Sequence, residues 1–244
     1  MKKTLLMLLL GATAAVAADA SLEPLMATTT AETKPYDVTL QFGIMHTENQ
    51  DYYVPEDKSS MIPSVLYGAS LAGQWEICSK DNSSHHVGFS VGYYTGDEDY
   101  SYVFPGYYAS TIHTSVDVIP LLLTYNYEYA LNDRISVYAG ARGGAVIRKT
   151  SFDNSMWDYS LIGQGKFLVD DSSTKVLPTV GVGIGAKVAF TENAALELGY
   201  DFAWAFGKDC GDIHAANGAV LNKDYYAKDN SYYGTVKVGF TFSF

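Results

Sequence analysis

The residues of this sequence that could do chemistry include histidines and carboxylates in two polar stretches. His85 and His86 are adjacent in a short polar stretch, and GDED at 96–99 lies in a longer one. The histidine pair has no third ligand at metal-binding spacing, and the acidic stretch lacks the spacing of a calcium-binding loop. We therefore expect a solvated histidine pair, a solvated acidic loop, and neither a metal nor another cofactor.

A histidine that activates a serine would be a second kind of site. His46 and His113 lie near the ends of apolar segments, and Ser110 and Ser115 are close to His113 in the sequence. Nucleophilic catalysis needs the serine and its base within hydrogen-bond reach, with the base oriented by a third group. No motif in the sequence indicates that arrangement, so the sequence predicts a protein that is not an enzyme.

Isolated charges inside apolar segments form the third set of candidates. Lys187 and Glu197, for example, lie on either side of a short link at 191–194. A buried charge must be paired, because burying it alone carries a large desolvation cost. We expect an interior ion-pair network formed by Glu76, Glu128, Arg142, Lys187, Glu197, Asp201 and Lys237.

The segments that carry these charges alternate between apolar and polar residues, with the period of two that is typical of a β-strand. At the end of the chain, one face carries Val236, Val238, Phe240, Phe242 and Phe244. The polar faces hold glycine and isolated charges of both signs. This composition fits the narrow interior of a small barrel better than the solvated face of a soluble β-sandwich, which is the alternative. Seven further segments alternate in the same way: YDVTLQFGIMH, VLYGASLAGQWEI, HVGFSVGYY, DVIPLLLTYNYEYAL, RISVYAGARGGAVIR, VLPTVGVGIGAKVAF and ALELGYDFAWAF.

The links between these eight segments alternate in length. The short links are 79–85, 132–134 and 191–194, and the long ones are 47–63, 95–111, 149–174 and 207–231. A tilted strand of about 9–11 residues is long enough to cross a bilayer. We therefore predict an all-β fold over residues 36–244: an eight-stranded antiparallel up-and-down transmembrane β-barrel with short periplasmic turns and long extracellular loops. Two conformations stay open for 149–174, a hairpin that extends the barrel or a segment that folds over its mouth.

Aromatic residues of outward parity gather at both predicted membrane interfaces. The periplasmic group is Tyr36, Trp75, Tyr127, Tyr129, Phe190, Phe242 and Phe244, and the outer group is Tyr93, Trp204 and Phe206. Aromatic girdles of this kind are typical of membrane barrels.

The N-terminus has the pattern of a secretory signal peptide. Two lysines precede an apolar stretch, and a small-residue cleavage site follows at Ala15 and Ala17. We expect residues 1–17 to be a signal peptide and residues 18–35 to be a short periplasmic segment. The formal net charge of −11 argues against nucleic-acid binding, which needs Lys and Arg to neutralise phosphates.

The chain resembles the small outer-membrane β-barrel superfamily of Gram-negative bacteria: the opacity proteins, the outer-membrane protein X type and the transmembrane domain of outer-membrane protein A. The resemblance covers about residues 36–244 and rests on DVIPLLLTYNYEYALNDRISVYAGARGG, FTENAALELGYDFAW and the terminal KVGFTFSF. It implies a monomer in the outer membrane, in contact with outer-membrane lipid and lipopolysaccharide. In that family the barrel-assembly machinery recognises the last strand by strand addition. The positions of that assembly signal are occupied by Lys237, Gly239, Phe242 and Phe244.

These features together favour a non-enzymatic protein with a structural or surface-interaction role, in adhesion or envelope integrity. Its acidic extracellular loops would contact a host or envelope partner, and they are rich in tyrosine and asparagine, which suit such contacts. One alternative is the binding or transport of a small solute through a narrow barrel. A less favoured one is a lipid A-modifying enzyme, an activity known among small outer-membrane barrels that uses histidine and serine at the lipid-facing rim.

The two cysteines are expected to stay unbonded. Cys78 ends an apolar segment just before a short link, whereas Cys210 begins a long stretch on the other side of the predicted membrane. The apolar band of a barrel is about 25 Å tall, and a disulfide needs its Cα atoms within about 7 Å.

Overall fold

The computed structural model describes residues 36–47, 62–104, 108–158, 166–216, 218, 220–221 and 229–244. The chain divides into two units, residues 1–33 and 34–244, and every described residue lies in the second. The predicted signal peptide with Ala15 and Ala17, and the predicted periplasmic segment 18–35, lie outside the described residues.

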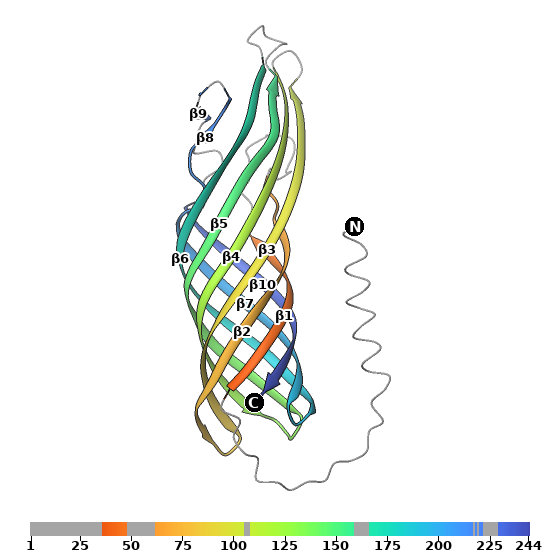
Figure 1. Ribbon diagram of the computed structural model, residues 1–244, viewed down its shortest axis with the longest axis vertical. Coiled ribbons are helices and arrows are strands. Elements are labelled where there is room, and N and C mark those ends of the chain that lie inside the picture. Colours follow the sequence, from red (N-terminus) through yellow and green to blue (C-terminus); the bar gives the residue numbers. More distant parts are fainter. Residues whose placement is uncertain are drawn as a thin grey trace. The chain divides into compact units, whose positions relative to one another are not determined.

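Eight antiparallel strands close into a barrel (Figure 1). The barrel strands are β1 (Tyr36–Thr47), β2 (Val65–Lys80), β3 (Ser83–Phe104), β4 (Tyr108–Ala130), β5 (Ile135–Asp158), β6 (Lys166–Thr191), β7 (Ala194–Lys208) and β10 (Asp229–Ser243). Their order around the barrel is β1-β10-β7-β6-β5-β4-β3-β2, so the first strand pairs with the last. Two short strands, β8 (Ile213–His214) and β9 (Val220–Leu221), form a separate sheet. The predicted eight-stranded up-and-down barrel is confirmed.

Tight turns join the strands at one end of the barrel, which we call the turn end. They lie at 81–82, 131–134 and 192–193, close to the short links predicted from the sequence. In the turn before β5, the side-chain oxygen of Asn132 accepts hydrogen bonds from the backbone N–H groups of Arg134 and Ile135, both at 2.9 Å. An asparagine that caps its own backbone in this way favours a tight turn. We call the opposite end of the barrel the loop end.

Four neighbouring strands continue past the others at the loop end. β3 to β6 contain 22 to 26 residues, whereas β1, β2, β7 and β10 contain 12 to 16. The prediction that 95–111 and 149–174 are loops was therefore wrong in part, because strands occupy most of both stretches. Of the two conformations considered for 149–174, the extending hairpin is the one observed. The alternation of apolar and polar residues is lost in these extensions because, outside a membrane, the outward face of a strand does not have to be apolar.

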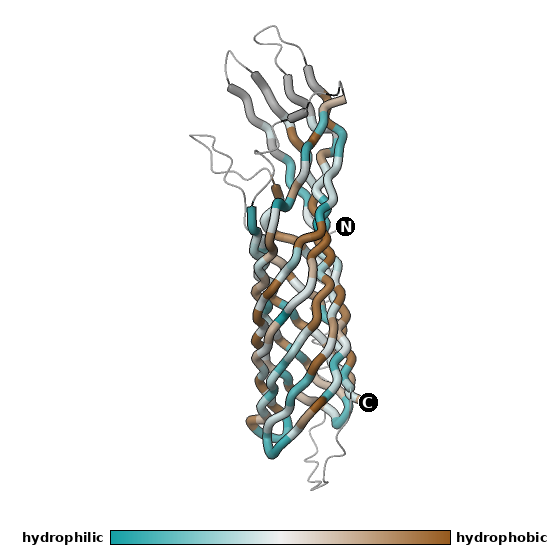
Figure 2. Tube along the Cα trace, turned by 90° about the vertical axis from the view of Figure 1, so that its left-hand side faces the viewer, coloured by the Kyte–Doolittle hydropathy of each residue, from teal (hydrophilic) through white to brown (hydrophobic). Residues whose placement is uncertain are grey.

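The outward face of the barrel is a belt of apolar side chains. Leu123 on β4 is 71% exposed, and outward aliphatic residues on the other barrel strands are exposed as well. Figure 2 shows apolar and polar residues mixed along the barrel strands, as the period of two requires. All ten predicted girdle residues are exposed, and Tyr67 and Tyr232 are further exposed tyrosines that the sequence analysis had not included.

Among the residues that the structure describes, no helix is long and apolar enough to cross a membrane.

Candidate functional site: the barrel interior and the loop end

Charged and polar side chains fill the barrel interior at the turn end. Lys187 of β6 places its Nζ 2.7 Å from Oε2 of Glu128 on β4 and 3.4 Å from Oδ2 of Asp37 on β1. Glu128 also accepts a hydrogen bond from Ser136 of β5 (2.6 Å), and Asp37 accepts one from Ser243 of β10 (2.6 Å). One lysine therefore links three strands, and each buried carboxylate keeps a counter-charge that offsets its lost hydration.

Glu197 of β7 is the common hydrogen-bond acceptor in a second cluster of interior polar side chains. It accepts hydrogen bonds from Gln41 of β1 (2.8 Å), Tyr138 of β5 (2.7 Å) and Thr241 of β10 (3.1 Å). Lys187 is its register partner on β6, but the ammonium group bonds the two carboxylates described above. Three neutral donors aimed at one carboxylate replace the water that it loses on burial, since hydrogen bonds to a charged group are stronger than neutral ones.

A third group lies further along the barrel, where Asp201 of β7 bridges two cations. Its carboxylate accepts a hydrogen bond from Nε of Arg142 on β5 (3.2 Å) and pairs with the ammonium group of Lys237 on β10. Nη1 of Arg142 also donates to Oδ1 of Asn126 on β4 (2.7 Å). All three charged side chains are buried. These groups together contain six of the seven charged residues that the sequence assigned to an interior network.

Glycines on the inward faces of β6 and β7 leave room for these long side chains. A Cβ atom at Gly185 would lie 2.5 Å from the ring and hydroxyl of Tyr138, and one at Gly199 would lie 2.6 Å from that hydroxyl. A Cβ atom at Gly183 would overlap the guanidinium group of Arg142. The glycines of this strand pair therefore have a steric role, because the interior of a small barrel is packed with side chains.

Toward the loop end the interior becomes apolar. Its buried cluster consists of Met45, Ile62, Leu66, Tyr94, Val116, Val118, Val146, Leu177, Ala203, Ala205 and Tyr233. A cavity of about 30 Å³ lies where the polar and apolar parts meet, lined by Asp201 and Lys237 as well as by Met45, Tyr94 and Tyr233. A space of that size holds about one or two water molecules.

A buried ion pair lies above the apolar cluster. Arg148 of β5 is 1% exposed, and its Nη1 lies 2.9 Å from Oδ2 of Asp209, which is 3% exposed and follows β7 directly. Asp209 also accepts a hydrogen bond from Ser231 of β10 (2.9 Å). Tyr233, from the next inward position of β10, is buried beside Arg148. The carboxylate therefore reaches inward from the end of one strand to groups on two others.

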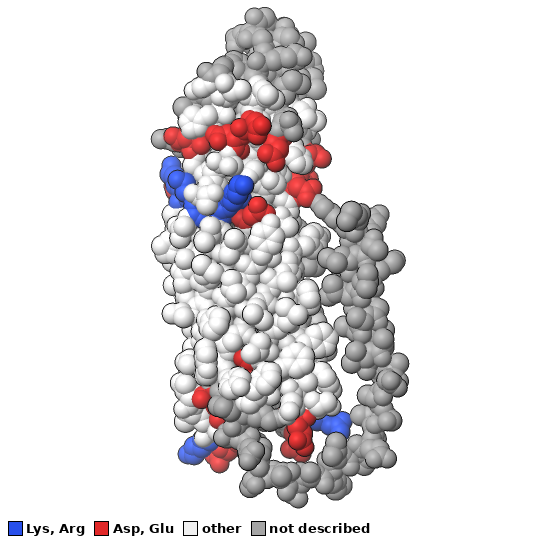
Figure 3. All heavy atoms as spheres, viewed as in Figure 1, with Lys and Arg blue, Asp and Glu red and all other residues white. Residues whose placement is uncertain are grey.

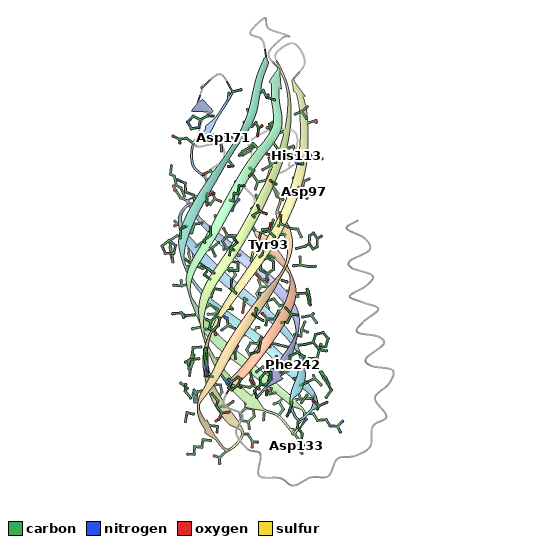
Figure 4. All side chains as sticks on the ribbon, viewed as in Figure 1. Tyr93, Asp97, His113, Asp133, Asp171 and Phe242 are labelled. Atoms are coloured by element: carbon green, nitrogen blue, oxygen red, sulfur yellow. The ribbon has the colours of Figure 1, made fainter. Side chains whose placement is uncertain are left out.

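Two carboxylate–imidazole pairs lie toward the loop end, one between β3 and β4 and one between β6 and β8; Figure 4 labels His113 of the first and Asp171 of the second. Asp99 of β3 contacts Nδ1 of His113 on β4, and Oδ2 of Asp171 on β6 lies 3.0 Å from Nδ1 of His214 on β8. The hydrogen bond that His113 donates to Asp99 raises the pKa of His113. Burial acts to raise the pKa of Asp171, but hydrogen bonds from the backbone and ring of His214 outweigh it and hold that pKa below its ordinary value. Neither imidazole is hydrogen-bonded to a serine hydroxyl among the described side chains.

His85 and His86 do not form the solvated pair that was predicted, because both lie in β3 rather than in the turn. His85 points outward and bonds the hydroxyl of Tyr125 (2.7 Å). His86 is buried, and its Nε2 bonds Oγ of Ser84 (2.8 Å). Glu128 lies 3.9 Å from the same nitrogen. In a catalytic triad the acid holds the other imidazole nitrogen, so this arrangement is not a triad.

The other residues considered from the sequence lie apart from these groups. His46 is exposed at the loop end of β1, and Ser115 is half-buried on β4. Ser110 belongs to β4, but its side chain is outside those described. Glu76 is half-buried near the turn end of β2, in register with His86. No three His, Cys, Asp or Glu side chains within the described ranges could hold a metal ion together.

Exposed charges gather at the two ends of the barrel. On the face shown in Figure 3, acidic side chains form a band toward the loop end, and the broad belt below it is almost free of charge. The predicted acidic loop at 96–99 is part of β3, although Asp97, Glu98 and Asp99 are exposed as expected. Asp153 of β5 and Asp170 of β6 are also exposed on the extended strands.

The C-terminal residues close the barrel. The ring of Phe244 stacks on Tyr36 with 5.4 Å between centroids, and its N–H donates to the carbonyl of Tyr36 (3.0 Å). Lys237 and Gly239 are buried on the inward face of β10, whereas Phe242, near the turn end in Figure 4, is exposed. Recognition of these residues by the assembly machinery stays a prediction.

The two cysteines lie at opposite ends of the barrel. Cys78 is exposed at the turn end of β2, and Cys210 is buried just beyond β7 at the loop end. Both thiols are free.

Several interior residues were missed at the level of sequence: Asp37, Gln41, Asn126, Tyr138, Arg148 and Asp209. For most of them the sequence contained a feature, strand parity, that could have identified them. Asp37 and Gln41 have the inward parity of YDVTLQFGIMH, and Arg148 has the parity of Arg142 on the same strand. Asp209 lies beyond the end of β7, where strand parity no longer predicts direction.

Comparison with known proteins shows which family model and which solved structures this barrel resembles. The family model described as the outer membrane protein beta-barrel domain matches residues 4–244. A comparison with curated proteins found no match.

Solved structures with a similar fold include a major outer membrane protein from Thermus thermophilus, with 11% identity and a TM-score of 0.51 over 86% of this chain and 99% of that one. The outer membrane protease OmpT from Escherichia coli matches with 10% identity and a TM-score of 0.49 over 90% and 99% of the two chains. Ail, the attachment invasion locus protein of Yersinia pestis, matches with 13% identity and a TM-score of 0.42 over 86% and 99%. At these identities the likeness concerns the fold alone.

Proposed function

This chain belongs to the outer membrane β-barrel domain family and is a bacterial outer-membrane protein, and from that premise we propose that it is a non-enzymatic surface protein. It acts through the loop end of its barrel, in adhesion or envelope integrity. The turn end faces the periplasm and the loop end faces outward, as in bacterial barrels with short periplasmic turns and long outer loops.

The observation that carries this proposal is the extension of β3 to β6 beyond the other strands. A tilted strand needs about 9–11 residues to cross the bilayer, so strands of 22 to 26 residues leave roughly half their length outside it. A paired sheet holds its exposed side chains in fixed positions, unlike a mobile loop. Rigid elements position a contact surface more accurately than loops do.

The charge of this surface indicates the chemistry of its contacts. Asp97, Glu98 and Asp99 on β3 and Asp153 on β5 are exposed. Next to the membrane they face the lipopolysaccharide layer, whose divalent cations they can share. A cationic region of a host or envelope protein is the matching partner, because complementary charge guides encounter and selects partners. We propose that the chain works as a monomer and that its apolar belt contacts outer-membrane lipid.

The two competing functions have less support. A cavity of about 30 Å³ has room for water but not for a solute, and buried ion pairs fill the interior toward the turn end. A lipid A-modifying enzyme would need a histidine beside a serine at the outer rim. His46 and His113 have no serine hydroxyl bonded to their rings among the described side chains.

Attachment of cells that produce the protein tests the proposal. Cells with the wild-type chain should bind to cultured epithelial monolayers more than cells without it. The triple variant Asp97→Asn, Asp99→Asn, Asp153→Asn should lose most of that gain. The matched variant Asp81→Asn, Asp133→Asn changes exposed aspartates at the turn end and should bind like the wild type.

Two outcomes would contradict the proposal. One is equal attachment of cells with the wild-type and triple-variant chains, at equal surface abundance. The other is steady conductance of the refolded barrel in a planar bilayer, which would favour solute passage instead.

A further inference from the structure

A short segment after β7 lies against the part of β6 that extends beyond the barrel. We call it the strap and define it as Asp209–Ala216, which includes β8 (Figure 1). Three of its backbone N–H groups donate to β6: Gly211 to Oγ of Ser173 (2.6 Å), His214 to Oδ2 of Asp171 (2.7 Å) and Ala216 to the carbonyl of Leu168 (2.9 Å). Only the last is a backbone–backbone bond. The strap is therefore held to β6 largely through side chains, and a regular strand ladder does not fix it there.

The strap covers apolar side chains that the extended sheet could not bury alone. Its own residues alternate between buried and exposed, with Cys210, Ile213 and Ala215 buried. On the inward face of the sheet, Phe152 of β5 and Val169 of β6 are each 1% exposed. Val169 bridges Ala215, and Phe152 is in register with Asp171, the acceptor for His214. Only β3 to β6 continue at this level, and the strap lies against the inward residues Asp171 and Ser173 of β6 there.

One end of the strap is anchored inside the barrel. Asp209 pairs with Arg148 and accepts the hydrogen bond from Ser231, and all three side chains are buried. The other end is held by His214 and Asp171, which are both partly exposed. An exposed pair contributes little to stability, whereas separating a buried pair is costly. The Arg148–Asp209 pair is therefore the strong attachment.

Glycines with left-handed backbone conformations flank the strap. Gly207 has φ of 102° and lies two residues before the strap, whereas Gly218, with φ of 82°, lies in the turn that joins β8 to β9 and donates its N–H to the carbonyl of Ala215 (2.8 Å). Residues with side chains rarely adopt these angles, so glycine is required where the chain changes direction this sharply. Changes of a few dihedral angles at such positions let a segment move without disturbing its neighbours.

The partner of the strap's buried anchor, Arg148, lies beside a residue that lines the cavity of the barrel interior. Tyr233 lines that cavity and is buried beside Arg148, the partner of Asp209.

We propose that the strap is a hinged lid over the outer end of the barrel interior, held shut by the Arg148–Asp209 pair and able to swing, together with β9, at Gly207. When it opens, the inward face of the extended sheet is exposed to the cell exterior while the barrel ladders stay intact. The lid goes beyond the proposed surface function, because it controls a second, inward-facing surface of the same extension.

Cys210 provides a native reporter of the lid, and Cys78 provides its internal control. In the closed state Cys210 is 1% exposed, and burial raises the pKa of its thiol, so both access and thiolate content are low. Cys78 is exposed. In the full-length protein solubilised in detergent, where both ends of the barrel are accessible, we expect a maleimide to modify Cys210 at least about tenfold more slowly than Cys78.

Asp209→Asn removes the charge that holds the lid, and we expect it to accelerate modification of Cys210 about tenfold or more. Asp212→Asn is the matched control, because Asp212 is an exposed aspartate of the same strap. It should leave the rate unchanged. Cys78 should react at the same rate in all three proteins.

Hydrogen exchange of the same variants separates a lid from general unfolding. Asp209→Asn should accelerate exchange of the strap amides, those of Gly211, His214 and Ala216, while the amides of β7 and β10 keep their protection. Three results would overturn the proposal: Cys210 as reactive as Cys78 in the wild type, no acceleration in Asp209→Asn, or faster exchange throughout β7 and β10 in that variant.

Discussion

Buried charged residues of this barrel are satisfied in two different ways. Lys187 and Asp201 are each held by ions of opposite charge, whereas Glu197 is held by the neutral groups of Gln41, Tyr138 and Thr241. Both arrangements offset the loss of hydration, because hydrogen bonds to an ion are strong where water is excluded. On the extended strands, acidic residues such as Asp97 and Asp99 are exposed, and their interactions are screened by solvent.

The exposed pair of His113 and Asp99 makes a pH-dependent contact between β3 and β4. Asp99 raises the pKa of His113. A group whose pKa is raised on folding contributes stability that is fully present below its unfolded pKa and is lost as the pH rises through the folded value. The contact should therefore weaken as the pH rises through the raised pKa of His113, with only a small effect on overall stability because both side chains are exposed.

Imidazole NMR titration checks this interpretation. Asp99→Asn should lower the pKa of His113, and Asp97→Asn should lower it less, because Asp97 acts on His113 only at longer range. An unchanged His113 titration in Asp99→Asn would show that the contact does not form in solution.

Among the strands, β6 depends on glycine to accommodate its neighbours. Its inward glycines lie against Tyr138 and Arg142, whose side chains extend across the interior toward the acidic residues of β7. A larger residue would displace these long side chains and separate them from their partners. The glycine content of the strand thus follows from the packing of the strand beside it.

Alanine at Gly185 should destabilise the barrel by about 1–3 kcal/mol, the usual cost of overpacking a filled interior. The added Cβ atom would lie 2.5 Å from Tyr138 and 2.6 Å from the backbone oxygen of Leu198. Alanine at Gly143 is the matched control, because a Cβ atom there meets nothing within 4 Å. Urea unfolding in lipid vesicles measures the free energy of unfolding of both variants. Equal stability of the two variants would contradict the steric role of Gly185.

The closing strand β10 makes the last pairing of the barrel, with β1. We expect deletion of Phe244, or its replacement by aspartate, to reduce insertion into the outer membrane while export to the periplasm continues. The ring would no longer stack on Tyr36, and the aromatic end of the predicted assembly signal would be lost. Insertion is measured as heat-modifiable migration of the protein in the outer-membrane fraction. Phe244→Tyr, which keeps an aromatic ring, is the control. Normal insertion after deletion would remove Phe244 from that signal.

At the scale of the whole barrel, an apolar belt separates two charged ends. Its exposed residues include Leu123, Val182 and Leu198, together with aromatic side chains such as Phe89 and Tyr200. In water such a belt would drive aggregation, but in a bilayer it is the surface that lipid covers. Because lipid covers the outward face of the strands, their charged residues had to face inward.

Arginine at Leu123 should therefore destabilise the inserted barrel by about 2–4 kcal/mol, as expected for a cation near the bilayer midplane. Arginine at Leu131, an exposed leucine in a turn at the turn end, should cost much less because it reaches water. Equilibrium unfolding from vesicles compares the two. A small effect at Leu123 would mean that the belt does not lie where lipid covers it.

The sequence by itself determined the strands, the direction of their side chains and the barrel. Lipid outside and a filled interior inside force apolar and polar residues to alternate, so segments such as ALELGYDFAWAF predict both faces at once. What the tertiary structure decided lies where that constraint ends. Beyond the membrane the alternation fades, which hid the extension of β3 to β6. Inside, parity places Lys187 on the inward face, but the register and closure of the barrel bring it to Glu128 and Asp37. The pairing of Asp209 with Arg148 depends on how a segment without strand periodicity docks against distant strands, and only the folded chain brings those residues together.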